Sequence, residues 1–496
     1  MTACSNGKVH IAAGIGLGIV MLILMCSWYP IYNSIIDSVL VLGEDKDVME
    51  MFTTPPIPIY MKFYMFNVLN PTEAQYYGEK PKLEEIGPYV YEEVRTKFNM
   101  DFSEDEKTIR YLENKTYFFR EDLSNGLKES DKITTVNMVM VLMAAMTYDI
   151  KYIGLVWPEI EATMNVFNNY TVGEALFEGW DLPVFNFNFG DIPGTDLSIT
   201  FNGTLLDLME ELGVADEDIP APIRENKIGY YTTLNYTDDG PWEVYTGKGD
   251  ISEYLNIAKW NNSVELDYWN DPYCDMINGT DGTQFPPRTI TEDSTVRMFV
   301  TELCRSLYLE FDFAGEYFGV DYLRFVAPVE MLQSPTLNPN NKCFSSTMGP
   351  LPSSLLEMTP CMGIPLVMST PHFYLGDGDQ LSMYEGLKPE KDKHDTFLDI
   401  QTTLGVPLRA HKRIQLNVPL RKYGNLTSFM NFDELYFPIF WADETATMSE
   451  EDTAMMKKVL TVPNIIVYTV GGILMAVALV LVYVGYRRHK QQTATV

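Results

Sequence analysis

The chain has 496 residues and a formal net charge of −32 at neutral pH, with 68 Asp and Glu against 36 Lys and Arg. This acidity excludes nucleic acid as a primary partner, because binding to phosphates requires a basic field. With 46% hydrophobic and 13% aromatic residues the chain is not disordered, and its length is sufficient to bury a large core.

The first predicted element is a membrane-spanning helix at residues 11–29, after a short tail at residues 1–10. No Asp, Glu, Lys or Arg occurs between Lys8 and Asp37. The apolar run is longer than the hydrophobic part of a usual signal peptide, and it lacks a small-residue cleavage site. We therefore expect an uncleaved anchor rather than a signal peptide.

Residues 30–464 contain short runs of aromatic and β-branched residues, separated by turn signals such as Asn125-Gly126. The runs lie at residues 59–68, 87–98, 116–121, 228–236, 306–313, 322–328, 397–404 and 413–420. This pattern predicts one antiparallel, barrel-like β domain. No internal repeat or low-complexity linker divides it.

Helical signals interrupt the strand pattern at about residues 134–180. The segment at 136–146 is apolar on nearly all sides and rich in Met, which suits either an adaptable binding surface or plain core. Pro158 with Glu159 and Glu161 predicts the start of a second helix, because proline fits a first turn and acidic residues favour the positive end. A third helix is expected at 172–180. The candidate residues for capturing a ligand or lipid at this cap are Leu155, Trp157, Met164 and Phe167.

The last predicted element is a second spanning helix at residues 465–486, followed by a short tail at 487–496. Arg487, Arg488 and Lys490 follow the apolar run directly, which favours a membrane anchor over a buried core helix. All Asp and Glu residues lie between Asp37 and Asp452. Positive charge is retained on the cytoplasmic side, so we expect both tails in the cytoplasm and an acidic ectodomain outside.

Seven N-glycosylation sequons lie between the anchors and none lies in a tail, as expected for a domain in the secretory lumen. They are Asn114, Asn169, Asn202, Asn235, Asn261, Asn278 and Asn425.

The six cysteines divide into two groups. Cys4 and Cys26 lie beside or within the first anchor, where either acylation or an idle thiol fits. The other four are Cys274, Cys304, Cys343 and Cys361. An even number in an oxidising compartment is expected to form disulfides. Zinc is the competing interpretation, but the spacings contain no short ligand pair.

Catalytic signatures are missing from the sequence. No HExxH, GxSxG, Walker or dinucleotide-binding pattern occurs. We expect no enzyme activity, no catalytic residue, no metal site and no cofactor. A two-helix channel is also disfavoured, because the spanning helices carry no charged lining residue.

Several motifs resemble the class B scavenger receptor family across nearly the whole chain. They include FNVLNPTEA at 66–74, IGPYVYEE at 86–93, CDMINGTDGTQFPP at 274–287, LCRSLYLEF at 303–311, GIPLVMSTPHFYLGD at 363–377, FLDIQTTLGVPL at 397–408 and FPIFWADET at 437–445. The resemblance implies an α+β membrane protein, with two transmembrane helices flanking a large antiparallel β-barrel-like ectodomain. It also implies an apical helical bundle, an internal hydrophobic tunnel, and disulfides Cys274–Cys343 and Cys304–Cys361.

The resemblance further implies a cell-surface scavenger-type receptor that binds lipid or lipoprotein cargo and passes apolar lipid through the tunnel to the membrane. Fatty acids, sterols and carotenoids are the cargo classes expected, and the oligomeric state stays open. Residues 152–167 lack the lysines of family members that bind anionic particles, and the tail at 487–496 lacks a lysosomal sorting signal. We therefore expect the plasma membrane rather than the lysosome. The alternative is a recognition, adhesion or trafficking receptor for a protein or apoptotic-cell ligand, without lipid conduction.

Overall fold

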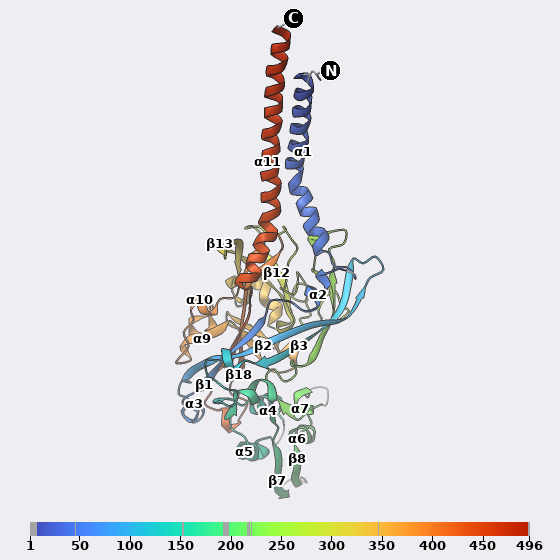
Figure 1. Ribbon diagram of the computed structural model, residues 1–496. Helices are drawn as coiled ribbons and strands as arrows, with labels where there is room; N and C mark the ends of the chain where they lie inside the picture. Colours follow the sequence, from blue (N-terminus) through green and yellow to red (C-terminus); the bar gives the residue numbers. More distant parts are fainter. Residues whose placement is uncertain are drawn as a thin grey trace.

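The structure is a computed structural model that describes residues 7–44, 46–150, 153–191, 198–215, 219, 221–345 and 347–494. Cys4 lies outside these residues. Figure 1 shows two long helices at one end of the molecule, a β domain in the middle and a group of short helices and strands at the far end.

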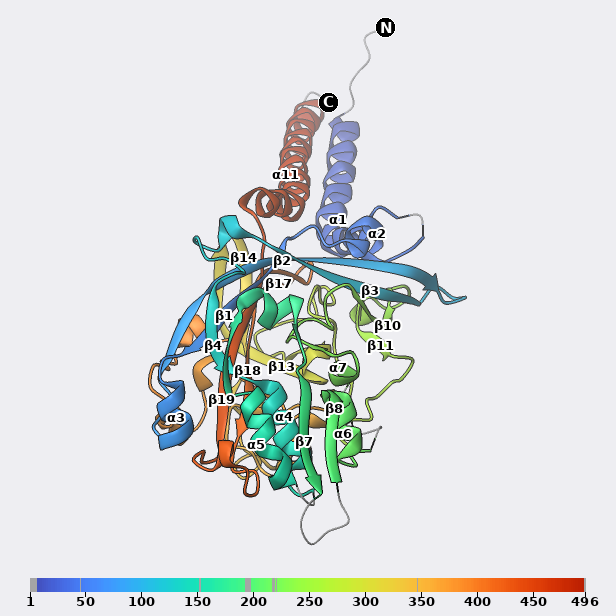
Figure 2. The same ribbon diagram turned by 90° about the horizontal axis from the view of Figure 1, so that it is seen from below.

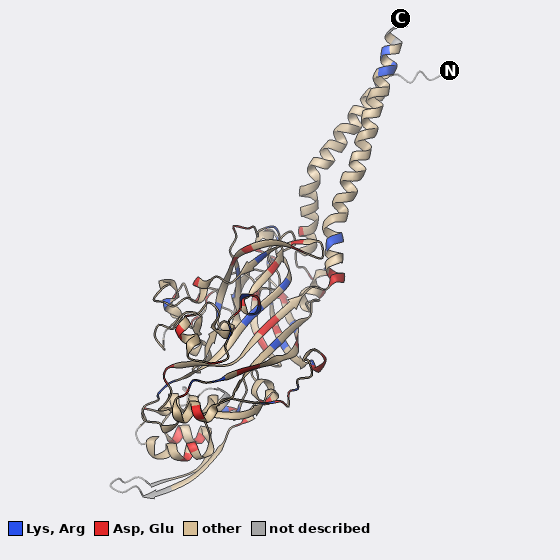
Figure 3. Ribbon diagram, turned by 90° about the vertical axis from the view of Figure 1, so that its left-hand side faces the viewer, with Lys and Arg blue, Asp and Glu red and all other residues tan. Residues whose placement is uncertain are grey.

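The two long helices are α1 (Gly7–Leu40) and α11 (Glu450–Ala494). They lie side by side with both chain ends on the same side of the molecule (Figure 1). Both are apolar and long enough to cross a membrane, and little charge lies along their length (Figure 3). They extend beyond the predicted spans 11–29 and 465–486, because each helix continues into the ectodomain.

A 13-stranded sheet forms the middle of the molecule, in the order β11-β10-β3-β2-β1-β19-β18-β17-β14-β13-β12, with β15 and β16 branching from β18. All of its strand pairs are antiparallel. The strands are β1 (Ile59–Val68), β2 (Leu83–Phe102), β3 (Thr108–Phe119), β10 (Thr237–Tyr245), β11 (Ile257–Trp260), β12 (Val296–Val300), β13 (Arg305–Tyr317), β14 (Val320–Val326), β15 (Leu355–Glu357), β16 (Val367–Ser369), β17 (Phe397–Gln401), β18 (Val406–Leu420) and β19 (Leu435–Thr447).

Residues 279–280 join the two ends of this sheet. The Ile257 N–H of β11 donates to the Gly279 carbonyl at 2.8 Å, and the Phe299 N–H of β12 donates to the Thr280 carbonyl at 2.8 Å. Gly279 has a φ of +81°, and an added Cβ would collide with the Arg297 carbonyl, so this bridge requires glycine. The bridge removes the free sheet edges, and the predicted barrel-like domain is confirmed.

The predicted strands fall within the sheet with one exception, residues 228–236. There the only strand is β9 (Lys227–Ile228), paired with β6 (Trp180–Asp181), and the chain then turns. The Tyr230 and Tyr231 N–H groups donate to the Ala175 and Leu176 carbonyls, while both rings pack against Phe440. The aromatic side chains of this run therefore pack into the core although their backbone forms a turn. The strand prediction is wrong here.

The apical region is larger than the predicted interval 134–180, because the chain continues there to about residue 228 (Figures 1 and 2). Its elements are β4 (Lys132–Val136), α4 (Met138–Thr147), α5 (Ile153–Thr163), β5 (Phe167–Thr171), the π-helical turn η2 (Glu174–Glu178), β6, β7 (Val184–Asp191), β8 (Ser198–Thr204), α6 (Leu205–Glu211), α7 (Ala221–Arg224) and β9.

The predicted helix start at Pro158 is wrong, because α5 begins at Ile153 and contains Pro158. The buried face of α5 is formed by Ile153, Val156, Trp157 and Ile160. This spacing is that of one helical face, so its burial maintains the helix through the proline.

Short helices and loops surround the barrel. The helices are α2 (Val48–Thr53), α3 (Pro71–Tyr77), α8 (Thr359–Met362), α9 (Gly378–Ser382) and α10 (Lys391–His394). The cysteines pair as Cys274–Cys343 and Cys304–Cys361, the pairing that the family resemblance implies. These disulfides join the loops around residues 274 and 304 to the segment at 339–362.

Candidate functional site

A cavity of about 470 Å³ lies inside the barrel, at the end nearest the two long helices. Its volume is within the range of about 300–1,000 Å³ that is usual for ligand sites. Part of its apolar wall comes from the end of α1, from α2, from Met448 before α11 and from the start of α11: Leu40, Val48, Met51, Phe52, Met448, Met455, Met456 and Val459. Barrel residues such as Trp242, Phe299 and Val406 form the rest. The ectodomain ends of both long helices therefore contribute to the apolar wall of the cavity.

A layer of paired charges forms a polar part of the cavity wall, and we call it the ionic layer; all of its members except Glu93 line the cavity. Its members are Glu93, Arg95, Lys97, Glu113, Lys115, Glu302, Lys412 and Glu444. Arg95 lies 2.6 Å from Glu93 and 2.5 Å from Glu444. Lys97 lies 3.1 Å from Glu113, Lys115 lies 2.8 Å from Glu302, and Lys412 contacts Glu302 and Glu444. The layer contains equal numbers of acidic and basic groups, so its charges balance.

Mutual proximity keeps most of these groups charged in spite of their burial. Burial alone would raise the pKa of Glu113, but Lys97 and its other basic neighbours lower that pKa to about 2. Glu93 behaves differently, since burial raises its pKa and the adjacent Glu444 opposes ionisation, which together outweigh Arg95. A polar surface inside a largely apolar cavity is therefore maintained by pairing.

A layer of aromatic side chains, the aromatic layer, fills the barrel on the apical side of the ionic layer. Phe63 packs against Tyr231 at 5.0 Å and Phe440 at 5.5 Å between ring centroids, and Tyr91 packs against Phe177 at 4.5 Å. None of these rings lines the cavity. The cavity thus ends at the ionic layer, and aromatic side chains separate it from the apex.

The ionic layer is not predicted from the sequence. On β2 the buried positions alternate, so that Glu93, Arg95 and Lys97 point inward while Val94 points outward and is partly exposed. A charged face on a strand normally faces water, and the complementary charges come from distant strands. The only signal was this inverted alternation, which one sequence cannot distinguish from a solvated face.

The structure separates the four candidate apical residues. Leu155 is 42% exposed on α5, whereas Trp157 is 1% exposed. The Trp157 indole donates to Glu161 and its ring packs near Phe429. Met164 is buried as well, and Phe167 packs against Phe432 and Phe437. Of the four, only Leu155 presents a large apolar surface to solvent.

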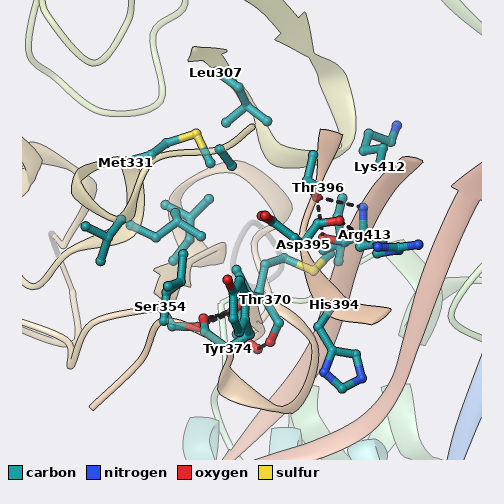
Figure 4. A pocket seen from close by; sticks show the side chains of 18 of the residues that line it. Leu307, Met331, Ser354, Thr370, Tyr374, His394, Asp395, Thr396, Lys412 and Arg413 are labelled. Carbon is teal, nitrogen blue, oxygen red and sulfur yellow. Dashed lines mark hydrogen bonds between the residues drawn. The ribbon is translucent and has the colours of Figure 1, made fainter. Parts of the chain in front are cut away.

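A second, much smaller pocket of about 50 Å³ lies beside β18 on the flank of the barrel (Figure 4). Met331 and Leu307 line one side of it, and Asp395, Thr396 and Arg413 lie on the other. Burial raises the pKa of Asp395 to about 6. Because a water molecule occupies about 30 Å³ of liquid, this pocket has room for one or two waters and not for a lipid.

Glu85, His372 and His394 lie close enough together to hold a metal ion. The His372 Nε2 lies 2.5 Å from Glu85, while the Lys388 N–H donates to His372 Nδ1 and the Glu390 N–H donates to His394 Nδ1. An imidazole whose Nδ1 accepts a hydrogen bond carries its proton on Nε2, and that nitrogen cannot then bind a metal. These residues therefore form a hydrogen-bonded cluster. Burial, with His372 alongside, lowers the pKa of His394 to about 4.

The sequon asparagines differ in accessibility. Asn169, Asn202, Asn261 and Asn425 are exposed, and Asn278 is partly buried. Two others are hydrogen-bonded within the barrel wall, because Asn114 Nδ2 donates to Asp238 and Asn235 Oδ1 accepts from the Tyr117 N–H. A glycan is attached through the amide nitrogen, and that of Asn114 is already engaged by Asp238.

The barrel between two terminal helices fits a family of membrane proteins whose sequences resemble this chain. The model of the CD36 family matches residues 11–488. The chain belongs to the CD36 family. Lysosome membrane protein 2 of Rattus norvegicus is 30% identical over 89% of this chain and 85% of its own length. Sensory neuron membrane protein 2 of Manduca sexta is 31% identical over 87% of this chain and 84% of its own length. Scavenger receptor class B member 1 of Bos taurus is 29% identical over 94% of this chain and 86% of its own length.

Membership of the CD36 family confirms the resemblance found in the sequence motifs. It supports a receptor role, since a scavenger receptor is among the relatives. The relatives also include a protein named for the lysosomal membrane, so family membership leaves the cellular membrane open.

Proposed function

We propose that this CD36-family protein is a plasma-membrane receptor that captures lipid or lipoprotein cargo at its apex and passes apolar lipid through the barrel into the bilayer. The observation that carries the proposal is the cavity of about 470 Å³, to whose apolar wall the ends of both spanning helices contribute. A lipid in that cavity is already beside the membrane. Each methylene group that stays out of water contributes about 0.8 kcal/mol, so a lined path favours transfer without an energy source.

The ionic and aromatic layers obstruct this path between the apex and the cavity. Lipid moving from the apex must displace rings such as Phe63 and Tyr231 and then pass the paired charges around Arg95 and Glu444. An anionic headgroup would meet a glutamate beside each lysine of the layer. Neutral cargo such as sterols, esters or carotenoids avoids that repulsion, and it is the cargo class that we favour over free fatty acids.

Capture at the apex is assigned to the exposed side of α5. Leu155 supplies an apolar contact, and Glu159 lies on the same helix. With acidic rather than basic residues on this helix, binding of strongly anionic particles is disfavoured.

The test separates capture from conduction with matched variants of the full chain on cells. Ala446 lines the cavity on β19, and its neighbour Thr447 is exposed and does not line it. Ala446→Trp should reduce uptake of labelled sterol ester by about tenfold or more, equivalent to about 1.4 kcal/mol, while binding of lipoprotein particles stays unchanged. Thr447→Trp is the control for the bulk of tryptophan, and Leu155→Glu should reduce particle binding.

Surface abundance is measured for every variant, because misfolding would reduce both signals together. Normal uptake by Ala446→Trp at normal surface abundance would refute conduction through the cavity. That result would leave the alternative, a recognition, adhesion or trafficking receptor for a protein or apoptotic-cell ligand. Such a receptor needs no open path, and the aromatic layer fills the barrel between apex and cavity.

A further inference from the structure

A third cavity, of about 260 Å³, lies outside the barrel where the two long helices meet the base of the ectodomain. We call it the basal pocket. It lies between α1, α11, the turn that joins β13 to β14 and the turn that joins β17 to β18. Its lining residues are mainly polar: Tyr29, Tyr32, Asn33, Gly319, Val320, Asp321, Gln401, Thr403, Lys457, Leu460, Thr461 and Asn464.

Helix length places this pocket at the surface of the bilayer. The rise of α1 from Lys8, at the edge of the basic tail, to Trp28 is about 30 Å, which is the thickness of the hydrocarbon core. At that level the Trp28 indole donates to Asn464 of α11 at 2.7 Å, and the Tyr32 hydroxyl donates to the Val459 carbonyl at 3.1 Å. Trp and Tyr are typical of the membrane interface. The basal pocket therefore lies at the headgroups of the leaflet on the ectodomain side.

The pocket contains one positive and one negative group without partners. Within the described part of the chain, neither Lys457 nor Asp321 forms an ion pair or a side-chain hydrogen bond. The Lys457 ammonium lies against the backbone of Gly319, which has a φ of +78°, so a side chain there would displace it. The absence of a side chain at Gly319 thus leaves room for the positive charge at the β13–β14 turn.

Of two further groups, Asn33 favours a ligand with an N–H donor and Tyr29 favours a cation. The Asn33 Oδ1 atom is buried and has no hydrogen-bond partner among the described residues. A buried acceptor without a partner costs roughly 1–3 kcal/mol, so a donor from a ligand would be favourable. The ring of Tyr29 is 64% exposed beside it, and an aromatic face attracts a cation.

We propose that the basal pocket binds the phosphoethanolamine headgroup of a phospholipid from the adjacent leaflet. Lys457 would pair with the phosphate. Asp321 and the ring of Tyr29 would attract the primary ammonium, and Asn33 Oδ1 would accept one of its N–H bonds. A choline headgroup has the same charges but no N–H donor, so the geometry favours ethanolamine over choline. The inference does not depend on lipid conduction, because the pocket is separate from the barrel cavity.

The experiment measures lipid binding by native mass spectrometry of the full chain in detergent, titrated with four diacyl lipids of identical tails. The lipids are phosphatidylethanolamine, phosphatidylcholine, phosphatidylglycerol and diacylglycerol. Because charged hydrogen bonds are about twice as strong as neutral ones, we expect one ethanolamine lipid to bind at least about fivefold more tightly than the others. Lys457→Gln should weaken binding of all three phospholipids towards that of diacylglycerol, and Asn33→Leu should make ethanolamine and choline lipids equal. Asp321→Asn should reduce the preference for ethanolamine over glycerol headgroups.

The neighbouring Lys458 does not line the pocket, so Lys458→Gln controls for loss of one positive charge at this depth. Ala446→Trp, which fills the barrel cavity, controls for lipid bound there and should leave the preference unchanged. Equal binding of ethanolamine and choline lipids by the unaltered chain would overturn the proposal. So would equal effects of Lys457→Gln and Lys458→Gln, and loss of the preference in Ala446→Trp would assign the lipid to the cavity instead.

Discussion

Strand β2 has three of its charged residues, Glu93, Arg95 and Lys97, on the side that faces the barrel interior. Lys97 is buried, contacts Glu113 at 3.1 Å and lies over the rings of Phe52 and Tyr111. A buried charge is tolerated only with its partner, and removal of one member leaves the other without solvation. The ionic layer is therefore a stability requirement of the barrel as well as the polar wall of its cavity.

We expect Lys97→Met to lower the free energy of unfolding by about 3–5 kcal/mol, because Glu113 would remain buried without its nearest positive charge. The double variant Lys97→Met with Glu113→Leu should recover most of this loss, since apolar residues of similar volume replace the pair. Denaturant unfolding of the full chain measures both. A double variant as unstable as the single one would contradict this account of the layer.

At the scale of elements, the pairing of α1 with α11 depends on small residues. A Cβ on Gly14 would lie 2.6 Å from the Ala478 carbonyl oxygen, whereas no atom lies within 4 Å of a Cβ on Gly16. Further along, the Gly471 backbone lies beside the Met25 side chain. Close approach of backbones at such residues is the usual basis of helix association in lipid.

Gly14→Leu should therefore separate the two spanning helices, while Gly16→Leu, two residues away on an open face, should not. Cysteines introduced at Met25 and Gly471, with Cys26 replaced by Ser, report the separation as a loss of oxidative cross-linking. Strong cross-linking in Gly14→Leu, or equal losses in both variants, would show that the small-residue contact does not hold the pair together.

At the scale of the whole molecule, both termini lie on one side and the exposed sequons lie on the other side of the spanning helices. Positive-inside orientation then predicts that tags at both ends stay inaccessible on intact cells. Glycosidase treatment should lower the apparent mass. Replacement of Asn202 by Gln should remove one glycan, and the same change at Asn114, whose amide nitrogen donates to Asp238, should leave the mass unchanged. A terminal tag labelled on intact cells would refute this topology.

Features that depend on local pattern can be predicted from the amino-acid sequence. A charge-free run specifies a membrane span, alternation of aromatic and β-branched residues specifies strands such as 59–68, and the family motifs specify the disulfide pairs. These depend on near neighbours or on matched motifs, so one chain suffices to find them.

Only the tertiary structure decided which side chains are inside and which segments meet. It buried Trp157 and left Leu155 exposed on the same helix, turned the charges of β2 inward, and formed the aromatic run after Ile228 into a turn. The cavity and the basal pocket are each assembled from segments hundreds of residues apart. Burial, charge pairing and cavity volume are properties of such distant contacts, and for that reason no local pattern in the sequence encodes them.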